Sequence, residues 1–323
     1  MPSVIAHTKQ ARIIVADNGS TDGSIELIKD QFPSVEIFAL DANYGFCGGY
    51  NKALKQINSE YYVLLNSDVE VTANWLEPMV QLLDKNASIA AVQPKILSHH
   101  QKDQFEYAGA GGGFIDSWGY PFCRGRMFDF TEKDTGQYND TREVFWASGA
   151  CLVIRSEVYH HLGGLDETFF AHMEEIDLCW KIHRMDKQVY YCGASTVFHV
   201  GAGTLSRNNP RKTYYNFRNG LSLIYKHLPA NHLWIKFPLR IGLDVLAAIK
   251  FMLEGQQDDA KAVFRAIRDF MKTRNLTQHE RSALKKKFPY SMSQVYNGML
   301  IIDYYLLKRR VIPIEKLALN NPK

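Results

Sequence analysis

The first hundred residues alternate short apolar runs with amphipathic segments. Each apolar run is long enough for one buried strand, and the segments between them repeat apolar positions every three or four residues. The predicted strands cover residues 12–16, 35–40, 61–65 and 89–92, and the predicted helices cover 24–32, the stretch after a turn at 43–49, and 72–85. Strands that alternate with helices predict an α/β domain. We expect a mostly parallel sheet with helices on both faces and ligands at the carboxyl ends of its strands.

The pattern changes twice further along the chain. Residues 99–143 are rich in glycine, aspartate and aromatic residues and favour loops and short strands. Beyond them we predict strands at 145–154, 189–191 and 196–199, and a helix at 174–185. From residue 211 the pattern is helical, with breaks expected near Pro229, Pro238 and Pro289. A boundary near residue 205 therefore separates a domain at 1–205 from a helical region at 206–323.

Charge follows the same division. The net charge is +4, but residues 1–200 hold 16 Lys and Arg against 26 Asp and Glu, whereas residues 201–323 hold 22 against 8. This asymmetry favours an acidic half that holds the chemistry and a basic half that holds a partner. The alternative is that the basic helices are only solvated surfaces. Nucleic acid is not the expected partner, because the cations lie on apolar-faced helices without an aromatic platform for stacking bases.

The cysteines and the apolar runs indicate the cellular compartment. The five cysteines are scattered without a C-x-x-C pair, which argues against a disulfide framework and a zinc–thiolate site. The first ten residues do not resemble a signal peptide, and no run of about 18 apolar residues occurs. We therefore expect a cytoplasmic protein, with peripheral attachment to the inner face of the cell membrane as an extension of that expectation.

Polar residues follow the first and third strands. Asp17 and Asn18 come directly after one strand, and Asn66, Ser67 and Asp68 come after the other. A carboxylate such as Asp68 at a strand end suits Mg²⁺ or Mn²⁺, which commonly bridge to diphosphate oxygens. The competing interpretation is a cluster of turn-forming residues.

A glycine-rich turn opens the helix after the second strand. Within residues 43–51, Asn43, Gly45, Gly48 and Asn51 could let backbone N–H groups approach a phosphate. The segment is neither G-x-G-x-x-G nor a P-loop, so it is a weak signal by itself.

Three carboxylates start the helix at 174–185. Glu174, Glu175 and Asp177 favour a helix N-terminus through the helix dipole, which is the structural interpretation. Crowded carboxylates also raise one another's pKa and can provide a general base. His199 ends a strand, and its imidazole is either structural or a metal ligand beside a carboxylate.

One turn could contact sugars. Trp146 offers a stacking face, and the turn formed by Ser148, Gly149 and Ala150 offers a close backbone wall. The alternative for Trp146 is packing in the core.

Six segments in this order resemble the family 2 glycosyltransferases, and among them the rhamnosyltransferase-like branch of bacterial surface-polysaccharide synthesis. The resemblance covers about residues 1–205 and is specific because all six segments are in register. They are residues 15–24, 43–51, 64–68, 146–150, 169–180 and 199–204.

The resemblance implies a GT-A fold, a nucleotide-sugar donor carrying dTDP or UDP, and inversion at the anomeric carbon. It implies that Asp17 contacts the base, that the 43–51 loop borders the nucleotide, and that Asp68 is the last residue of the metal-binding D-x-D motif. Asn66 stands where that motif often has its first aspartate. His199 corresponds to a further metal ligand, and Glu175 to the catalytic base. The implied acceptor is a glycan or a lipid-linked sugar.

One departure from the family pattern affects the start of the chain. Family members normally begin with an apolar strand and an Asn-rich loop, and here Pro2-Ser3-Val4 matches a later segment. We expect the first strand of the sheet to be missing, through truncation in the interpretation we favour. The alternative function is a weakened nucleotide-sugar-binding or scaffold homologue.

The basic region predicts a membrane contact. Residues 258–272 place Val263, Phe264, Ile267, Phe270 and Met271 on one helical face, with cations on or beside the opposite face. This pattern is typical of an interfacial helix on anionic lipid. The alternative is that the same face packs against the catalytic domain or a second copy of the chain.

Overall fold

The computed structural model describes residues 1–201, 209–288 and 295–313. The chain divides into two compact units. The first unit comprises Met1–Gly113, Cys123–Ile182 and Lys187–Gly201, and the second comprises Phe114–Phe122, His183–Asp186 and Ala202–Lys323. The predicted boundary near residue 205 lies outside the described residues. Two short segments from the acidic half join the second unit, which local sequence patterns gave no reason to expect.

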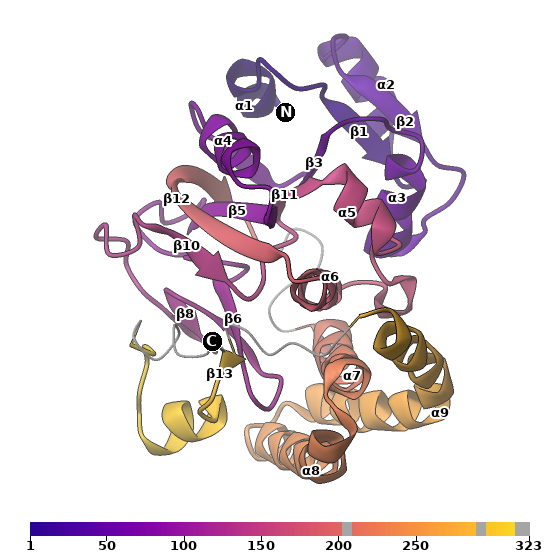
Figure 1. The fold of residues 1–323 in the computed structure, drawn as a ribbon, viewed down its shortest axis with the longest axis vertical. Helices are drawn as coiled ribbons and strands as arrows, with labels where there is room; N and C mark the ends of the chain where they lie inside the picture. Colours follow the sequence, from indigo (N-terminus) through magenta and orange to yellow (C-terminus); the bar gives the residue numbers. More distant parts are fainter. Residues whose placement is uncertain (202–208, 289–294, 314–323) are drawn as a thin grey trace. The chain divides into compact units, whose positions relative to one another are not determined.

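The first unit contains the predicted alternation of strands and helices (Figure 1). Its helices are α1 (Pro2–His7), α2 (Ser24–Gln31), α3 (Gly45–Leu54), α4 (Glu77–Lys85), α5 (Ser156–His161), the 3₁₀ turn η1 (Glu167–Phe169) and α6 (Glu174–Arg184). Its strands are β1 (Ile14–Asp17), β2 (Glu36–Ala39), β3 (Tyr61–Leu65), β4 (Val69–Val71), β5 (Ile89–Ser98), β8 (Arg126–Met127), β9 (Phe130–Thr131), β10 (Thr141–Val144), β11 (Cys151–Arg155) and β12 (Gln188–His199).

The main sheet of this unit is mixed, and the expectation of a mostly parallel sheet is wrong. Its strands follow the order β10-β12-β5-β11-β3, with β4 paired to β12. Only β5 and β12 run parallel, and every other pair in this sheet is antiparallel. The physical reason is connectivity: β11 follows a long loop segment rather than a crossover helix, so nothing forces it to run parallel to β3 and β5.

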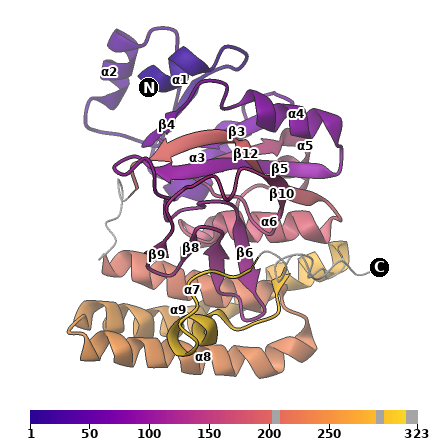
Figure 2. The same ribbon diagram turned by 90° about the vertical axis from the view of Figure 1, so that its left-hand side faces the viewer.

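Strands β1 and β2 form a separate parallel pair, with Ile14 opposite Glu36 and Asp17 opposite Ala39. Among the described residues, neither β1 nor β2 pairs with the main sheet, whose edge strand is β3. Figures 1 and 2 show α4 and α6 on opposite faces of the main sheet. The core beneath α4 joins this helix to β5 and β11 through Met79, Leu83, Val92 and Val153. These faces are covered because both strands are apolar on both sides.

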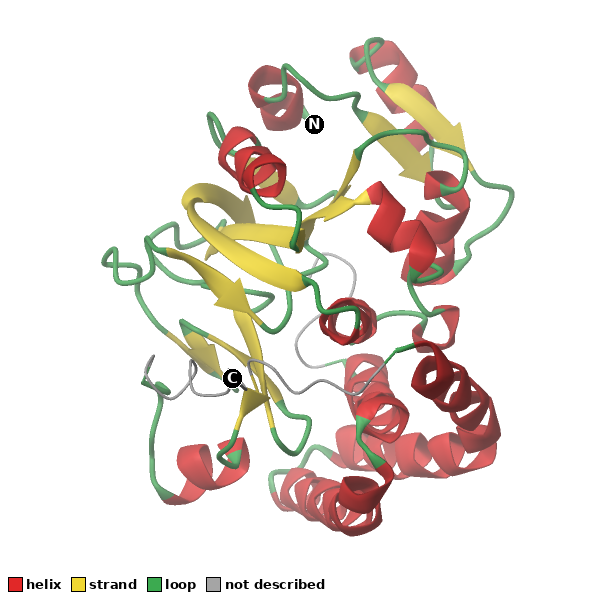
Figure 3. Cartoon of the chain, in the orientation of Figure 1, coloured by secondary structure: helices red, strands yellow, loops and turns green. Residues whose placement is uncertain are grey.

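The second unit is mainly helical (Figure 3). Its helices are α7 (Pro210–His227), α8 (Ala230–Leu253), α9 (Gln257–Lys287) and the short π-helix η2 (Ile302–Leu306). Strands β6 (Gly113–Asp116) and β13 (Val295–Tyr296) pair in parallel, and β7 (Pro121–Cys123) follows β6. The expected break at Pro229 is confirmed, because this residue caps α8. The break expected at Pro238 is wrong, because Pro238 lies inside α8.

The apolar face expected on the helix at 258–272 is largely an internal surface. Val263 and Phe270 are completely buried, and Ile267 is partly buried in a cluster with α7 and α8 residues. Phe264 and Met271 remain exposed. The prediction of one continuous free apolar face on this helix is therefore wrong, because α7 and α8 cover its centre. Within the described residues, no helix is long and apolar enough to cross a membrane.

The cysteines are free and buried. All five lie in the interior, and none forms a disulfide. Burial raises the pKa of each thiol above its ordinary value. They are therefore packing residues with little thiolate character.

Candidate active site

The ends of β3 and β12 bring Asp68 and His199 together. Strand β4 turns back after β3 and pairs antiparallel with β12, so Val69 lies opposite His199. A backbone hydrogen bond of 3.0 Å from Val200 N to Asp68 O closes this arrangement. The Nε2 atom of His199 then lies 3.1 Å from Oδ1 of Asp68. Residues 202–204, the rest of the motif that begins at His199, lie outside the described residues.

A second carboxylate faces the other side of the His199 ring. Oε2 of Glu106 lies 3.2 Å from Nδ1 of His199, and the same oxygen accepts a hydrogen bond from the backbone N–H of Ala108. Burial by itself would lower the pKa of His199, but its hydrogen bonds to Asp68 and Glu106 raise that pKa to about 9. The hydrogen bond from His199 holds the pKa of Asp68 below its ordinary value. Two anions therefore favour a protonated imidazole in the absence of a metal.

This pair fits a divalent metal ion as part of its coordination shell. One carboxylate and one imidazole are competent ligands for Mn²⁺ and less suited to Mg²⁺, which prefers oxygen alone. Two ligands about 2.1 Å from an octahedral ion on neighbouring positions are about 3 Å apart, close to the 3.1 Å found between Nε2 and Oδ1. Across residues 1–201, 209–288 and 295–313, no group of three or more His, Cys, Asp or Glu side chains could hold a metal. Phosphate oxygens and water would have to supply the remaining ligands.

Asn66 and Ser67 lie beside this pair without a metal-binding carboxylate of their own. Asn66 is half-buried and donates its backbone N–H to Ala150 O at 3.0 Å, while Ser67 is exposed. The backbone of Ala150, just before β11, therefore fixes the edge of the predicted metal site.

The first loop of the unit is tied to the glycine-rich turn by one side chain. Asp17 is buried at the end of β1 and accepts a hydrogen bond from Ser20 N at 3.0 Å. Asn18 donates to Gly45 O at 2.8 Å and accepts from Tyr44 N at 2.9 Å. Its neighbour Asn43 accepts from the backbone N–H of Gly45. The predicted nucleotide residues Asp17, Asn18, Asn43 and Gly45 are thus brought together.

Glycine is required at the start of α3. Gly45 has φ of +70°, and a Cβ atom there would lie 2.7 Å from the ring of Phe170. At Gly48 a Cβ atom would lie 2.9 Å from Tyr44. The turn is therefore packed closely against Phe170 and Tyr44, and only glycine fits at these two positions.

The side chain of Asn51 is hydrogen bonded within the protein. Its amide nitrogen donates to Leu165 O and to Glu167, and its amide oxygen accepts from Tyr159 and from Leu165 N. These four hydrogen bonds use the full capacity of the amide group. In this conformation Asn51 has none left for a nucleotide, although the sequence analysis placed it in the donor site.

We expect Asn51→Ala to lower the free energy of unfolding by about 2–4 kcal/mol, because several buried partners lose their hydrogen bonds. Denaturant unfolding measures this change. Asn58→Ala is the matched control, since Asn58 is exposed and should stay within about 0.5 kcal/mol of the parent. Equal stability of both variants would contradict the structural assignment.

The turn at 146–150 contacts both the residue after β3 and the start of α6. Trp146 is 3% exposed and Ser148 is 2% exposed, so both belong to the interior. The core-packing alternative for Trp146 therefore describes its position better than a stacking face does. Gly149 is different: a Cβ atom there would lie 3.8 Å from Cβ of Glu175 and 3.5 Å from the ring of Phe46. Ala150 accepts the backbone N–H of Asn66.

The three acidic residues of α6 have separate environments. Asp177 is completely buried in an ion pair with Lys181, at 2.7 Å on the same helix. Glu174 is buried, and Glu175 is half-buried. For Glu174 and Glu175, the Oε2 atom is inaccessible and has no hydrogen-bond partner among the described residues. Glu174 and Glu175 therefore each keep one carboxylate oxygen that no described residue of the protein binds.

Burial sets the proton affinity of this pair. It raises the pKa of Glu175 to about 7. Burial, and next the charge of Glu175, raise the pKa of Glu174 well above its ordinary value. Both carboxyls therefore bind a proton more tightly than an ordinary glutamate does, and a pKa near neutrality, as at Glu175, is what a general base requires.

The segment before α6 is strained. Phe170, His172 and Met173 all have positive φ, at 64°, 70° and 74°. Left-handed conformations are rare for such bulky residues and cost free energy. Because the backbone N–H of Phe46 is bonded to Phe170 O at 3.1 Å, this segment is held between the glycine-rich turn and the start of α6.

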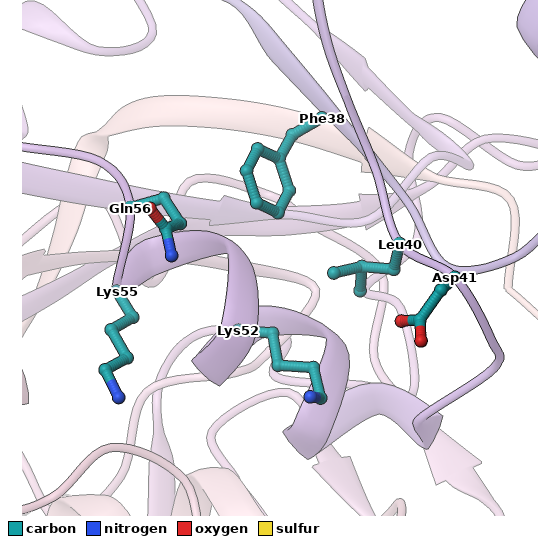
Figure 4. A pocket seen from close by; sticks show the side chains of 6 residues that line it. All are labelled: Phe38, Leu40, Asp41, Lys52, Lys55 and Gln56. Atoms are coloured by element: carbon teal, nitrogen blue, oxygen red, sulfur yellow. The ribbon is translucent and has the colours of Figure 1, made fainter.

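A small pocket lies on another side of α3. It is lined by Phe38, Leu40, Asp41, Lys52, Lys55 and Gln56 (Figure 4). None of the predicted donor or catalytic residues lines it. It is therefore separate from the cluster that contains Asn18, Asn43 and Gly45.

Sequence reasoning missed Glu106. This residue lies in the loop-rich segment at 99–143, where no periodicity or motif singled out one carboxylate. No sequence pattern reveals Glu106, because only the fold brings it close to His199.

Comparison with known sequences supports the resemblance to the family 2 glycosyltransferases. Residues 3–163, about half of the chain, match the model of Glycosyl transferase family 2. An N-acetylglucosaminyl-diphospho-decaprenol L-rhamnosyltransferase of Mycobacterium tuberculosis is 23% identical over an alignment of 222 residues that covers 63% of this chain and 71% of the relative. The low-salt glycan biosynthesis hexosyltransferase Agl10 of Haloferax volcanii is 22% identical over an alignment of 246 residues that covers 74% of this chain and 73% of the relative.

Structural comparison agrees at the level of the fold. A structure of GalNAc-T7 with UDP, GalNAc and Mn²⁺ aligns with a TM-score of 0.52 and 17% identity, over 71% of this chain and 44% of that protein. At this identity the likeness shows the GT-A fold alone. The family model, the similar glycosyltransferases and the shared fold point to one conclusion: this chain belongs to the family 2 glycosyltransferases.

Proposed function

We propose that this chain transfers a sugar from a nucleotide-sugar donor to an acceptor hydroxyl by one in-line displacement, with inversion at the anomeric carbon. Glu175 serves as the general base. Asp68 and His199 hold a divalent metal ion, and the 17–18 and 43–45 segments hold the nucleotide.

The observation that carries this proposal is the short path between the metal pair and the base. Asn66, at the end of β3, is hydrogen bonded to Ala150. The residue before Ala150, Gly149, approaches Glu175 closely enough that a Cβ atom built on it would lie 3.8 Å from Cβ of that glutamate. A single turn thus separates the metal end from the base end. Such an arrangement suits a donor diphosphate at one end and an acceptor hydroxyl at the other.

The base works through its proton affinity. A carboxylate with a pKa of about 7 is largely ionised at slightly alkaline pH, yet accepts a proton more readily than an ordinary glutamate. Glu175 removes the proton from the acceptor hydroxyl as that oxygen attacks the anomeric carbon. The bond from the anomeric carbon to the donor phosphate oxygen breaks in the same step. The raised pKa of Glu174 beside it disfavours a second negative charge next to Glu175.

A bound divalent metal would neutralise the charge that develops on the leaving diphosphate. Asp68 and His199 would be its protein ligands, and Mn²⁺ is favoured over Mg²⁺ by the imidazole. GalNAc-T7 was crystallised with Mn²⁺, which supports a metal in this fold. Asp17, buried and next to Asn18, is proposed to contact the base of the nucleotide.

We base the proposed donor and acceptor on the similar proteins. We propose a dTDP- or UDP-linked sugar, with rhamnose as the first candidate, and a glycan or lipid-linked acceptor. The support is similarity to an L-rhamnosyltransferase whose name specifies a decaprenol-linked acceptor.

The test is a screen for sugar transfer. Purified protein is incubated with Mn²⁺ and with dTDP-, UDP- or GDP-sugars, and release of the nucleoside diphosphate is measured with and without a lipid-linked acceptor. One donor should give release that depends on metal. Donor binding without any release, across all donors and acceptors, would favour the alternative of a nucleotide-sugar-binding scaffold.

Glu106 is expected to position the metal ligand. A carboxylate on the far nitrogen of a metal-binding histidine fixes the orientation of the ring, and its loss typically weakens metal affinity about 10–100-fold. Glu106→Gln should therefore weaken Mn²⁺ binding by about that factor, as measured by calorimetry or by the paramagnetic resonance of free Mn²⁺. Glu60→Gln, at an exposed site, is the control. Unchanged Mn²⁺ affinity would refute the positioning role, whatever happens to activity.

A further inference from the structure

Helix α8 exposes a row of apolar residues on one face and buries an ion pair on the other. Its most exposed large side chains include Trp234 at 83%, Leu246 at 61% and Leu253 at 84%. Together with Ile235, Leu239 and Ile249 they follow the helical repeat of about 3.6 residues, so they occupy one face of the helix. We call these six residues the α8 stripe. Figure 2 shows α8 beside α9 in the helical unit.

The inner face of the same helix holds a buried ion pair. Arg240 and Asp244 are 4% and 1% exposed, and they form an ion pair with Nε to Oδ1 at 2.9 Å. The guanidinium group of Arg240 also lies 3.8 Å from the ring centre of Tyr120 and donates to Trp118 O. This anchoring fixes the rotation of α8 about its axis. Turning its leucines inward would expose this ion pair and break the contacts of Arg240 with Trp118 and Tyr120.

This distribution reverses the usual rule for a helix at a protein surface. Soluble proteins seldom bury a charged pair while leaving a continuous row of large apolar side chains in water. Such a row indicates that another apolar phase covers it.

The exposed apolar surface continues onto η2. The ammonium group of Lys250, on α8, lies 5.9 Å from the ring centre of Tyr305. Ile302, Leu306 and Leu307 in the same region are 41%, 73% and 52% exposed. The surface is therefore formed by two segments that are distant in sequence.

The charges around this surface are mainly positive. Asp244 is the one acidic residue of α8, and it is buried against Arg240. Lys250 is exposed and pairs with Glu254, just past the end of the helix. Lys308, Arg309 and Arg310 are exposed directly after Leu307, with Arg309 paired to Asp303. An apolar row beside cations is complementary to an anionic lipid surface, whereas a second copy would bring the same cations together.

We propose that the α8 stripe and the exposed end of η2 dock on an anionic lipid bilayer. Helix α8 lies in the plane of the membrane, with its leucines at the boundary between headgroups and acyl chains and its buried ion pair toward the protein. A helix of 24 residues gives this contact a length of about 36 Å. The proposed membrane contact is therefore on α8 and not on the helix at 258–272, whose apolar centre is buried. It does not depend on the proposed sugar transfer.

The test is vesicle co-sedimentation with the full chain. Vesicles of phosphatidylcholine alone are compared with vesicles that also contain phosphatidylglycerol. The protein should bind the anionic vesicles, and binding should weaken as salt rises. Replacing both Leu246 and Leu253 with serine should lower the partition coefficient at least about tenfold, because several buried methylene groups are lost.

Leu276→Ser is the matched control. Leu276 is 62% exposed, like Leu246, but lies on α9 outside the α8 stripe. This variant should bind vesicles like the parent. All variants are exposed-site substitutions, and their folding is checked by circular dichroism. The proposal is overturned if the folded parent does not bind anionic vesicles at low salt, or if both variants bind equally well. A dimer in lipid-free buffer that dissociates in the Leu246/Leu253 variant, without vesicle binding by the parent, would assign the stripe to a second copy.

Discussion

Replacing Glu175 with glutamine is expected to lower turnover by about 10²-fold or more while donor affinity stays near that of the parent. Glutamine keeps the shape of the side chain but cannot accept the proton of the acceptor hydroxyl. Steady-state kinetics give turnover, and calorimetry with the donor gives affinity. Glu157→Gln is the control, because Glu157 is also an acidic residue at the start of a helix but is exposed. Near-normal turnover would exclude Glu175 as the base and make Glu174 the next candidate.

The same assignment predicts a pH dependence with a definite sign. The base must be ionised to act, and burial raises the pKa of Glu175 to about 7. In the parent enzyme kcat/KM should rise about tenfold per pH unit below that value and level off above it. The residual activity of the glutamine variant should lack this limb. A flat profile for the parent between about pH 5 and 8 would contradict the raised pKa.

The Glu175→Gln substitution, which should lower turnover, should raise the folding stability of the protein above about pH 7. A carboxyl whose pKa is raised in the folded state stabilises the fold below its unfolded value of about 4.3 and loses that contribution as pH rises through about 7. Glu175→Gln should therefore make the protein more stable than the parent above about pH 7, and the gain should be absent below about pH 4. Thermal melts at the two pH extremes test this. Together, lower turnover and higher stability would distinguish a catalytic residue from a structural one.

Loss of the Asp68 carboxylate should have an equally large effect. We expect Asp68→Ala to lower metal-dependent turnover by at least about 10²–10³-fold, because the charge on the leaving diphosphate is no longer neutralised by a correctly held ion. Mn²⁺ titration should show a matching loss of affinity. His199→Ala should have a smaller effect, because an imidazole contributes no negative charge to the ion.

Asp103→Ala provides the control for this substitution. Asp103 is an exposed aspartate that pairs with Lys133, so its loss should leave both activity and Mn²⁺ affinity unchanged. Full activity of the parent in excess EDTA would refute the metal hypothesis independently of any variant.

Local patterns predicted the part of the fold in which sequence neighbours are also spatial neighbours. The alternation from β1 to β3 follows from apolar runs and from turns such as that around Gly45, and the start of α6 follows from its acidic residues. Helix α4 begins at Glu77 rather than at residue 72, because residues 69–71 form β4. Strand β12 is one strand rather than two, because a register shift between Cys192 and Thr196 absorbs the interruption in its apolar pattern.

Strand direction could not be predicted in this way. Strand β11 is inserted between β3 and β5, far from both in sequence, and its antiparallel direction depends on the path of the preceding loop. The same limit applies to the candidate site. Asp68 and Glu175 lie at element ends that a sequence pattern reveals, whereas Glu106 and the inner face of α8 are defined only by long-range packing.

The five buried cysteines have a practical consequence. Since reagents such as maleimides attack thiolates, and all five thiols are buried with raised pKa values, the native protein should be nearly unreactive at neutral pH. A single cysteine introduced at Leu253 would then be the one fast-reacting thiol in the described structure. A polarity-sensitive fluorophore attached there would report directly whether that position enters a lipid phase, without removing any native cysteine.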